Sequence, residues 1–308
     1  MIQVESLTKH YGDTVAVDAL SFTVHPGVVT GFLGPNGSGK STTMRMILGL
    51  DRPTGGTASV NGRPLADHAA PLTEMGMLLE AGAVHPKRSA RNHLRALAAT
   101  NGIPDSRVDE VIRLVGLEDV ARRRSGGFSL GMGQRLGIAS ALLGDPETIM
   151  LDEPVNGLDP EGILWIRHLL KGLAREGRTV FVSSHLMSEM SLTAEHFVII
   201  GKGRLIADVT ADELEAMASH QSVRVRTPDA TRLRETVART GVSVTSAERG
   251  VLTISGMTSD DVGIAAAAAG IVLYELVPQQ SSLEEIFMEL THDAVQYRAG
   301  AQREGAVR

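Results

Sequence analysis

Residues 34–42 have the types and the spacing of a phosphate-binding loop. They read Gly-Pro-Asn-Gly-Ser-Gly-Lys-Ser-Thr and fit the pattern G-x-x-x-x-G-K-[ST]. The glycines allow successive backbone N–H groups to turn around an anion without Cβ clashes, and a helix that begins here adds the positive end of its dipole. Lys40 would contact the β- and γ-phosphates, and the hydroxyl of Ser41 would bind Mg²⁺. A glycine-rich chain also produces such strings by chance, but a strand pattern before the loop and a helical pattern after it favour phosphate binding.

Two carboxylates follow the apolar segment 148–151. Carboxylates at the end of a strand in a parallel sheet lie in the crevice where ligands bind. We expect Asp152 to hold Mg²⁺, directly or through water, and Glu153 to activate a water molecule as general base. An ordinary acidic turn is the alternative for Asp-Glu-Pro, and the phosphate loop elsewhere in the chain favours the catalytic role.

His185 follows a second apolar segment, residues 180–184. A single histidine at the start of a loop is often a surface or capping residue. Its place at the end of a neighbouring strand favours another role, in which it hydrogen-bonds the γ-phosphate and orients Glu153 and the water.

The alternation of strand and helix patterns predicts an α/β fold with a largely parallel sheet. An antiparallel β part precedes the loop, and a helical subdomain is inserted at about residues 86–144. We place the first domain at residues 1–217. The patterns of residues 221–290 follow the order β-α-β-β-α-β, which predicts a small α+β domain of ferredoxin-like fold. Residues 291–308 are predicted to form a flexible tail.

Composition excludes several classes of protein. The 308 residues include 43% hydrophobic residues, no cysteine and a formal net charge of −6. Disorder, a disulfide framework and thiolate metal sites are therefore excluded, and we expect no nucleic-acid partner. The most apolar stretch, Gly263–Leu276, is shorter than the roughly 20 residues that span a membrane, and the N-terminus lacks the layout of a signal peptide. We expect a cytoplasmic protein that reaches a membrane only through a partner.

Six elements, in order, resemble the ATP-binding subunit of an ABC transporter over about residues 1–215. They are an aromatic residue expected to stack on adenine (Tyr11), the Walker A loop (Gly34–Thr42), the signature (Phe128–Arg135), the Walker B strand (Met150–Glu153), the D-loop (Asn156–Asp159) and the switch histidine (His185). This family has a P-loop NTPase fold. The resemblance implies that ATP is bound by Tyr11, Gly34, Asn36, Gly37, Ser38, Gly39, Lys40, Ser41, Thr42, Ser129, Gly131 and Asp159.

The resemblance also implies how the chain assembles. Ser129 and the N–H of Gly131 stand before a helix predicted at Gly133–Leu143, where a hydroxyl, an amide and a helix dipole would meet an anion. In this family the anion is the γ-phosphate held by a second copy, so ATP joins a head-to-tail homodimer. A helix cap with no further role is the alternative for Ser129.

Two departures from the family pattern narrow the resemblance. Leu130 and Met132 replace a glycine and the glutamine of the usual signature, and Glu80 stands where the family places a glutamine. A carboxylate at position 80 can still bind Mg²⁺ but cannot donate a hydrogen bond, and a surface acid is its alternative interpretation. This combination resembles the ATPases of bacitracin- and lantibiotic-type exporters.

We therefore predict an ATP hydrolase that powers a separate membrane permease for export of an antibiotic, a peptide or a drug-like substrate. By resemblance, the surface from Glu80 to about Arg95 would receive the permease. A soluble ABC ATPase acting on a macromolecule is the rival interpretation, and a P-loop metabolic kinase is a third, against which the signature and D-loop argue. Residues 122–124 are three arginines. They would contact phosphates, lipid headgroups or the permease; the alternative is that they are a solvated part of a surface loop.

Overall fold

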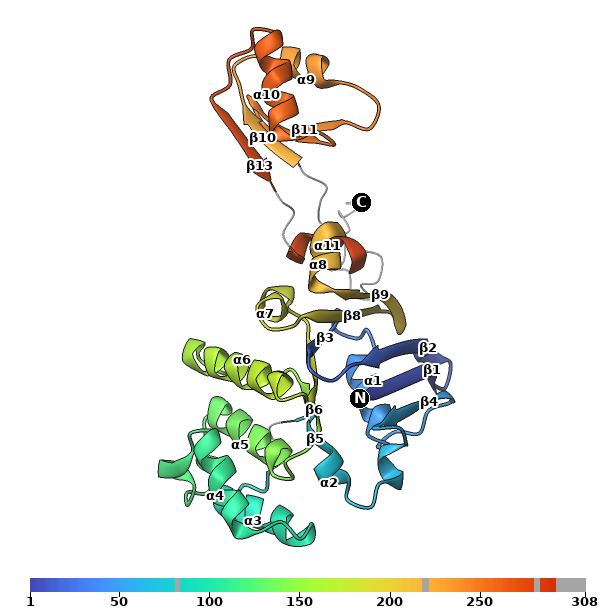
Figure 1. Cartoon of the computed structure of the whole chain (residues 1–308), viewed down its shortest axis with the longest axis vertical. Coiled ribbons are helices and arrows are strands. Elements are labelled where there is room, and N and C mark those ends of the chain that lie inside the picture. The colour runs from blue at the N-terminus through green and yellow to red at the C-terminus, as the bar shows by residue number, and fades with distance from the viewer. Residues whose placement is uncertain (81–83, 218–221, 280–282, 292–308) are drawn as a thin grey trace, which may run out of the picture. The chain divides into compact units, whose positions relative to one another are not determined.

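The computed structural model of the chain describes residues 1–80, 84–217, 222–279 and 283–291. The chain divides into two compact units, residues 1–211 and residues 212–290 (Figure 1). The predicted flexible tail began at residue 291, but Thr291 is buried and is the last residue of the helix Leu283–Thr291. The rest of that tail, residues 292–308, lies outside the described part.

A six-stranded sheet forms the centre of the first unit. Its order is β5-β6-β7-β3-β8-β9, with parallel pairing throughout except for the antiparallel edge strand β9. Every residue of the two central strands β3 and β7 is buried, as expected for strands covered on both faces. The strands are β3 (Val29–Leu33), β5 (Met75–Leu78), β6 (Thr148–Asp152), β7 (Thr179–Ser184), β8 (His196–Gly201) and β9 (Arg204–Thr210).

An antiparallel sheet packs on one side of this centre. It has the order β2-β1-β4 and consists of β1 (Ile2–Tyr11), β2 (Thr14–Val24) and β4 (Gly55–Val60). Three phenylalanine rings join the two sheets: Phe22 lies 5.6 Å from Phe32 and 5.7 Å from Phe181, and Phe32 lies 5.0 Å from Phe181, between ring centroids. Helix α1 (Lys40–Ile47) contributes its buried methionines to the same core.

The helices α5 and α6 lie on the other side of the six-stranded sheet, with α3 and α4 beyond α5 (Figure 1). Three of these helices begin at side-chain N-caps, in which Ser89, Ser129 and Asp159 each accept a hydrogen bond from a backbone N–H three residues on. The helices are α2 (Pro71–Glu74), α3 (Ala90–Thr100), α4 (Asp105–Leu114), α5 (Leu130–Leu142), α6 (Pro160–Arg175) and α7 (Met187–Ser191).

The second unit contains a four-stranded antiparallel sheet of order β11-β12-β10-β13. Its core gathers the inward side chains of the sheet with those of α9 and α10, among them Val223, Leu233, Ile254 and Val262. Its elements are α8 (Ala211–Met217), β10 (Ser222–Arg226), α9 (Ala230–Val237), β11 (Ser243–Glu248), β12 (Val251–Ser255), α10 (Ser259–Ala268), β13 (Glu275–Gln279) and α11 (Leu283–Thr291).

One predicted helix boundary differs from the structure. Helix α5 begins at Leu130 rather than Gly133, because Ser129 already caps it. In the second unit, β13 pairs with β10 over Glu275–Gln279, and Ile271 before it is buried in the core without pairing to β10. Among the helices of the described residues, none is long and apolar enough to cross a membrane.

Candidate functional site

The glycines of the 34–42 loop are required by their surroundings. Gly37 and Gly39 have φ values of +79° and +103°, in the region that side-chain-bearing residues rarely adopt. A Cβ on Gly34 would lie 2.5 Å from the carbonyl oxygen of Ile200, and one on Gly39 would lie 2.6 Å from that of Ala16. The loop therefore keeps its shape only with glycine at these positions.

Lys40 is buried within this loop. Its side chain is 7% exposed, and its Nζ donates to the carbonyl oxygen of Gly34 at 2.6 Å and to that of Pro35 at 3.3 Å. Burial lowers the pKa of Lys40, and the carboxylates of Glu153 and Asp152 oppose this effect. The predicted acidic residues thus lie close enough to act on the lysine.

Asp152 is held by two hydroxyl groups. Ser41 Oγ donates to Asp152 Oδ2 at 2.8 Å, which joins α1 to the end of β6. Ser183, on the neighbouring strand β7, donates to Asp152 Oδ1 and accepts from the backbone N–H of Glu153 at 2.9 Å. The structure therefore brings together two of the three residues predicted to hold Mg²⁺, Ser41 and Asp152.

Glu153 and His185 form a pair. His185 Nδ1 lies 2.9 Å from Glu153 Oε2. The backbone φ of Glu153 is +49°, unusual for a residue with a side chain. A further carboxylate stands nearby: burial raises the pKa of Glu189, the charge of Glu153 adds to the rise, and His185 and Arg167 oppose it.

The loop has the features that a phosphate group and a hard cation require. Ser38 is 2% exposed, and its Oγ has no hydrogen-bond partner within the described residues, so a polar group is buried and ready to accept a partner. The hydroxyl of Ser41 and the carboxylate of Asp152 are oxygen donors of the kind that Mg²⁺ prefers. Across the described residues, no three His, Asp or Glu side chains gather as a metal site.

Tyr11 lies at the end of β1, with 51% of its surface exposed. Its hydroxyl donates to Asp51 Oδ2 at 3.2 Å, and Lys9 Nζ lies 5.0 Å from the ring centroid. Asp51 is itself held by Arg45 of α1 through bonds of 2.8 and 3.0 Å. The predicted adenine-binding ring is thus connected to the helix that follows the phosphate loop.

Glu80 is exposed and comes two residues after β5. Because β5 pairs in parallel with β6, with Leu78 opposite Leu151, Glu80 leaves the sheet at the edge where Asp152 and Glu153 lie. Within the described residues no hydrogen bond joins it to the phosphate loop, and residues 81–83 lie outside the described part.

The signature and the D-loop lie beside each other. Ser129 accepts from Met132 N at 3.2 Å and is exposed, and Asp159 caps α6 by accepting from Gly162 N at 2.9 Å. A Cβ on Gly131 would lie 3.1 Å from the carbonyl oxygen of Gly157. In the described structure no hydrogen bond joins Ser129 to the phosphate loop of its own chain.

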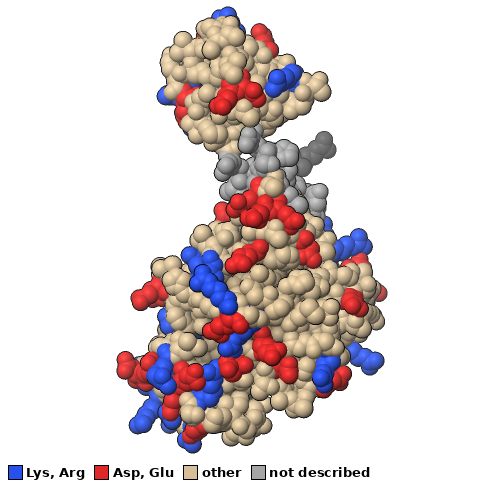
Figure 2. Space-filling model, viewed as in Figure 1, with Lys and Arg blue, Asp and Glu red and all other residues tan. Residues whose placement is uncertain are grey.

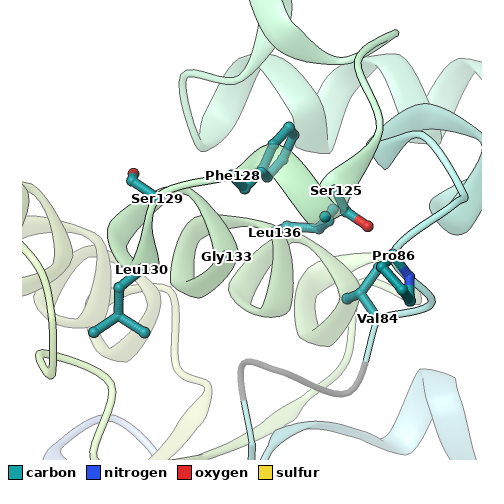
Figure 3. Close-up of a pocket in the computed structure, with 9 residues that line it drawn as sticks. Val84, Pro86, Ser125, Phe128, Ser129, Leu130, Gly133 and Leu136 are labelled. Carbon is teal, nitrogen blue, oxygen red and sulfur yellow. The ribbon is translucent and has the colours of Figure 1, made fainter.

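A pocket of about 340 Å³ lies beside the start of α5. Val84, Pro86, Phe128 and Leu136 give it apolar walls (Figure 3). The three arginines at 122–124 come just before the pocket residues Ser125 and Phe128 in the sequence, and all three are exposed. Figure 2 shows basic and acidic side chains interspersed over the helical part of the first unit.

Sequence reasoning missed three residues of the site. Ser183 holds both carboxylate residues, and its position two residues before His185 was the available signal. Gln134, which donates to the carbonyl oxygen of Glu153 at 3.3 Å, lies inside the signature helix and is 4% exposed. Asp51 gave no signal, because it lies in a polar turn after α1.

Comparison with known proteins agrees with this geometry. A family model described as ABC transporter matches residues 17–156, and a model described as a domain of unknown function matches residues 221–284. The bacitracin transport ATP-binding protein BcrA of Bacillus licheniformis is 42% identical over 218 residues, which cover 70% of this chain and 71% of that protein. The chain belongs to the ATP-binding proteins of ABC transporters. It is accordingly an ATP hydrolase with a P-loop fold.

Further similarities extend to the rest of the chain and to solved structures. The daunorubicin resistance ATP-binding protein DrrA3 of Streptomyces coeruleorubidus is 32% identical over 306 residues, or 95% of this chain and 96% of that protein. The structure of an ATP-binding subunit of an ABC transporter matches with a TM-score of 0.65 at 28% identity, covering 70% of this chain and 92% of that one. A dimeric cassette bound to ADP and phosphate matches with a TM-score of 0.62 at 25% identity, covering 68% and 99%.

Proposed function

We propose that this protein is the ATPase subunit of an exporter for an antibiotic, a peptide or a drug-like compound, and that it works as a homodimer on a separate membrane permease. The similarity to proteins named for bacitracin transport and daunorubicin resistance supports the substrate class. The hydrogen-bonded group of Ser41, Asp152, Ser183, Glu153 and His185 is the observation that carries the proposal. The soluble, macromolecule-directed alternative has no observation in its favour.

In this proposal ATP lies along the 34–42 loop. The backbone amides and Lys40 bind the phosphates, Ser38 Oγ gains a partner, and Tyr11 stacks on adenine. The residues assigned to ATP in this copy are Tyr11, Gly34, Asn36, Gly37, Ser38, Gly39, Lys40, Ser41 and Thr42. Support comes from the glycine conformations and from the buried lysine.

Ser41 and Asp152 would hold Mg²⁺, with Glu80 as a further candidate at the same edge of the sheet. The ion would stabilise charge on the phosphate oxygens. Glu153 would accept a proton from the attacking water, and His185 would orient its carboxylate. The 2.9 Å contact between His185 and Glu153 supports this assignment.

The second copy would complete the site with Ser129, Gly131 and Asp159. Ser129 caps α5, so the amides and dipole of this 13-residue helix point toward an anion beside the serine. The dimeric state of the similar cassette supports this arrangement.

The permease would bind the surface from Glu80 to about Arg95. The apolar pocket walls at Val84 and Pro86 support this position. The protein would then be peripheral on the inner face of the membrane.

We take residues 1–217 as the ATP-binding domain, with its helical subdomain at about 86–144. We take residues 221–290 as a ferredoxin-like domain, and the strand order β11-β12-β10-β13 supports this assignment.

The Glu153→Gln variant tests the proposal. Loss of the general base should reduce ATP turnover on the order of 10²- to 10⁴-fold while ATP binding persists. The ATP-bound dimer should then accumulate, and size-exclusion chromatography with light scattering should detect it.

The Lys40→Ala variant is the control for ATP dependence. It should remain monomeric under the same conditions, because it cannot hold the phosphates. A Glu153→Gln protein that stays monomeric and still hydrolyses ATP would contradict the assignment of the general base.

A further inference from the structure

One face of α5 contacts the 153–159 loop, which connects Glu153 to helix α6. Leu130 and Gln134 lie on this face, since residues four apart follow one another along a helix. Leu130 contacts Gly157, and Gln134 contacts Glu153. Figure 3 shows Leu130 projecting from the first turn of α5, where it also lines the pocket that Pro86 and Leu136 line.

Leu130 lies directly over Gly157. Gly157 has a φ of +77°, and a Cβ built on it would lie 2.2 Å from Leu130 Cδ2 and 2.3 Å from Leu130 Cγ. The three atoms nearest that Cβ all belong to Leu130. Leu130 is otherwise 67% exposed, so burial in the core does not explain its position. Because the usual signature has a glycine here, the contact depends on a feature that distinguishes this chain.

Gln134 holds the peptide group of Glu153. Its Nε2 donates to the carbonyl oxygen of Glu153 at 3.3 Å, while the N–H of Glu153 donates to Ser183 Oγ at 2.9 Å. Gln134 is 4% exposed, so its side-chain amide is buried in the interior. The left-handed conformation of Glu153, with φ at +49°, persists only where its surroundings hold it.

We propose that Leu130 and Gln134 are positioning residues for Glu153. Gln134 fixes the strained peptide of Glu153 from one side, and Leu130 fixes the loop that follows by covering Gly157. The side chain of Glu153 is thereby kept at His185 Nδ1. The inference rests on the proposed role of Glu153 as general base.

The Gln134→Met variant tests the hydrogen bond. Methionine keeps the length and burial of the side chain but cannot donate. In the full-length protein we expect kcat for ATP hydrolysis to fall on the order of tenfold to a hundredfold, with KM for ATP unchanged, because displacement of a catalytic group affects the chemical step. If Gln134 had only a structural role, Gln134→Met would lower the melting temperature without lowering kcat selectively over KM.

Trp165 provides the check on folding. It is the only tryptophan of the chain, and the Arg135 guanidinium lies 4.5 Å from its ring centroid. Unchanged Trp165 emission in Gln134→Met would show that α5 and α6 still pack together.

The Gly157→Ala variant tests the leucine contact. Its new Cβ would collide with Leu130, so we expect kcat to fall; adding Leu130→Ala should then restore part of the lost kcat, because the colliding atoms are removed. Leu164→Ala is the matched control, since Leu164 is an α6 leucine with 51% exposure and no assigned role, and turnover should be unchanged.

Two results separate this inference from the proposed function. If Gln134→Met keeps normal kcat, or the double variant is no better than Gly157→Ala alone, the positioning role is overturned even though Glu153→Gln abolishes turnover. If Glu153→Gln itself hydrolyses ATP normally, the general base assignment fails and the inference fails with it.

Discussion

Glu80 stands where the family resemblance leads us to expect a glutamine. It leaves the sheet at the edge that carries Asp152. If its carboxylate contributes to the metal site, Glu80→Gln should raise the Mg²⁺ concentration needed for half-maximal turnover by about tenfold or more. A titration of ATPase activity with Mg²⁺ measures this. Glu118→Gln, which removes an exposed carboxylate elsewhere, should leave the titration unchanged, and an unchanged titration for Glu80→Gln would leave it as a surface acid.

Glu189 should make stability depend on pH. Burial raises its pKa, so the folded state favours the protonated carboxyl. The contribution to stability is then present at acid pH and lost as pH rises through the folded pKa. Glu189→Gln, which stays neutral, should therefore raise the melting temperature at neutral pH and change it little near pH 4, where the unfolded glutamate is itself about half protonated. A destabilised variant at neutral pH would mean that attraction to Arg167 and His185 outweighs burial.

The residues proposed to do chemistry could be picked out from the sequence, and the residues that hold them in place could not. Lys40, Asp152, Glu153 and His185 follow from motif and strand-end position, and the structure brings them together. Ser183 lies two residues before His185, but a serine in an apolar strand does not show which neighbouring strand it faces until the strand order is known.

At the scale of the helix, Ser129 has two separable roles. It caps α5, and it is proposed to contact the γ-phosphate of the partner copy. Aspartate caps a helix as well as serine does, but its charge repels phosphate, so Ser129→Asp should keep the melting temperature and lose turnover. Ser129→Ala should lower stability by about 1 kcal/mol. Thermal unfolding and ATPase rates of the two variants provide the test, and normal turnover in Ser129→Asp would reduce the serine to a cap.

Element boundaries depended on signals that differ in strength. The start of α5 was predicted at Gly133, because the glycines of the signature weaken the helical pattern. In the structure Ser129 is the N-cap, and the helix begins at Leu130. Strand β4 was not predicted, because Gly55 and Gly56 are poor strand residues; it forms by pairing with β1. The start of α5 is thus set by a cap, and the formation of β4 is set by pairing with a strand distant in sequence.

For the whole molecule, the test concerns the partner. A tagged full-length chain, purified from gently solubilised membranes, should retain a polytopic membrane protein, and the complex should hydrolyse ATP faster than the subunit alone. Mass spectrometry and ATPase assays measure the two outcomes. Retention of only soluble macromolecules would favour the rival interpretation of a non-transport ATPase.

The two units were not equally predictable. The first carries motifs whose spacing is dictated by phosphate chemistry, so its fold and site could be anticipated together. The second has a strand and helix order that can be read from periodicity, but its residues carry no motif, and the model that matches residues 221–284 describes a domain of unknown function. Its sequence therefore predicts an architecture without a role.

The contacting rings of Phe22, Phe32 and Phe181 have a consequence for the proposed nucleotide site. They fix the sheet that ends at Tyr11 against the strand that leads into the phosphate loop. In the proposed site, the distance between the base at Tyr11 and the phosphates at residues 34–42 would then be set by this packing of the two sheets.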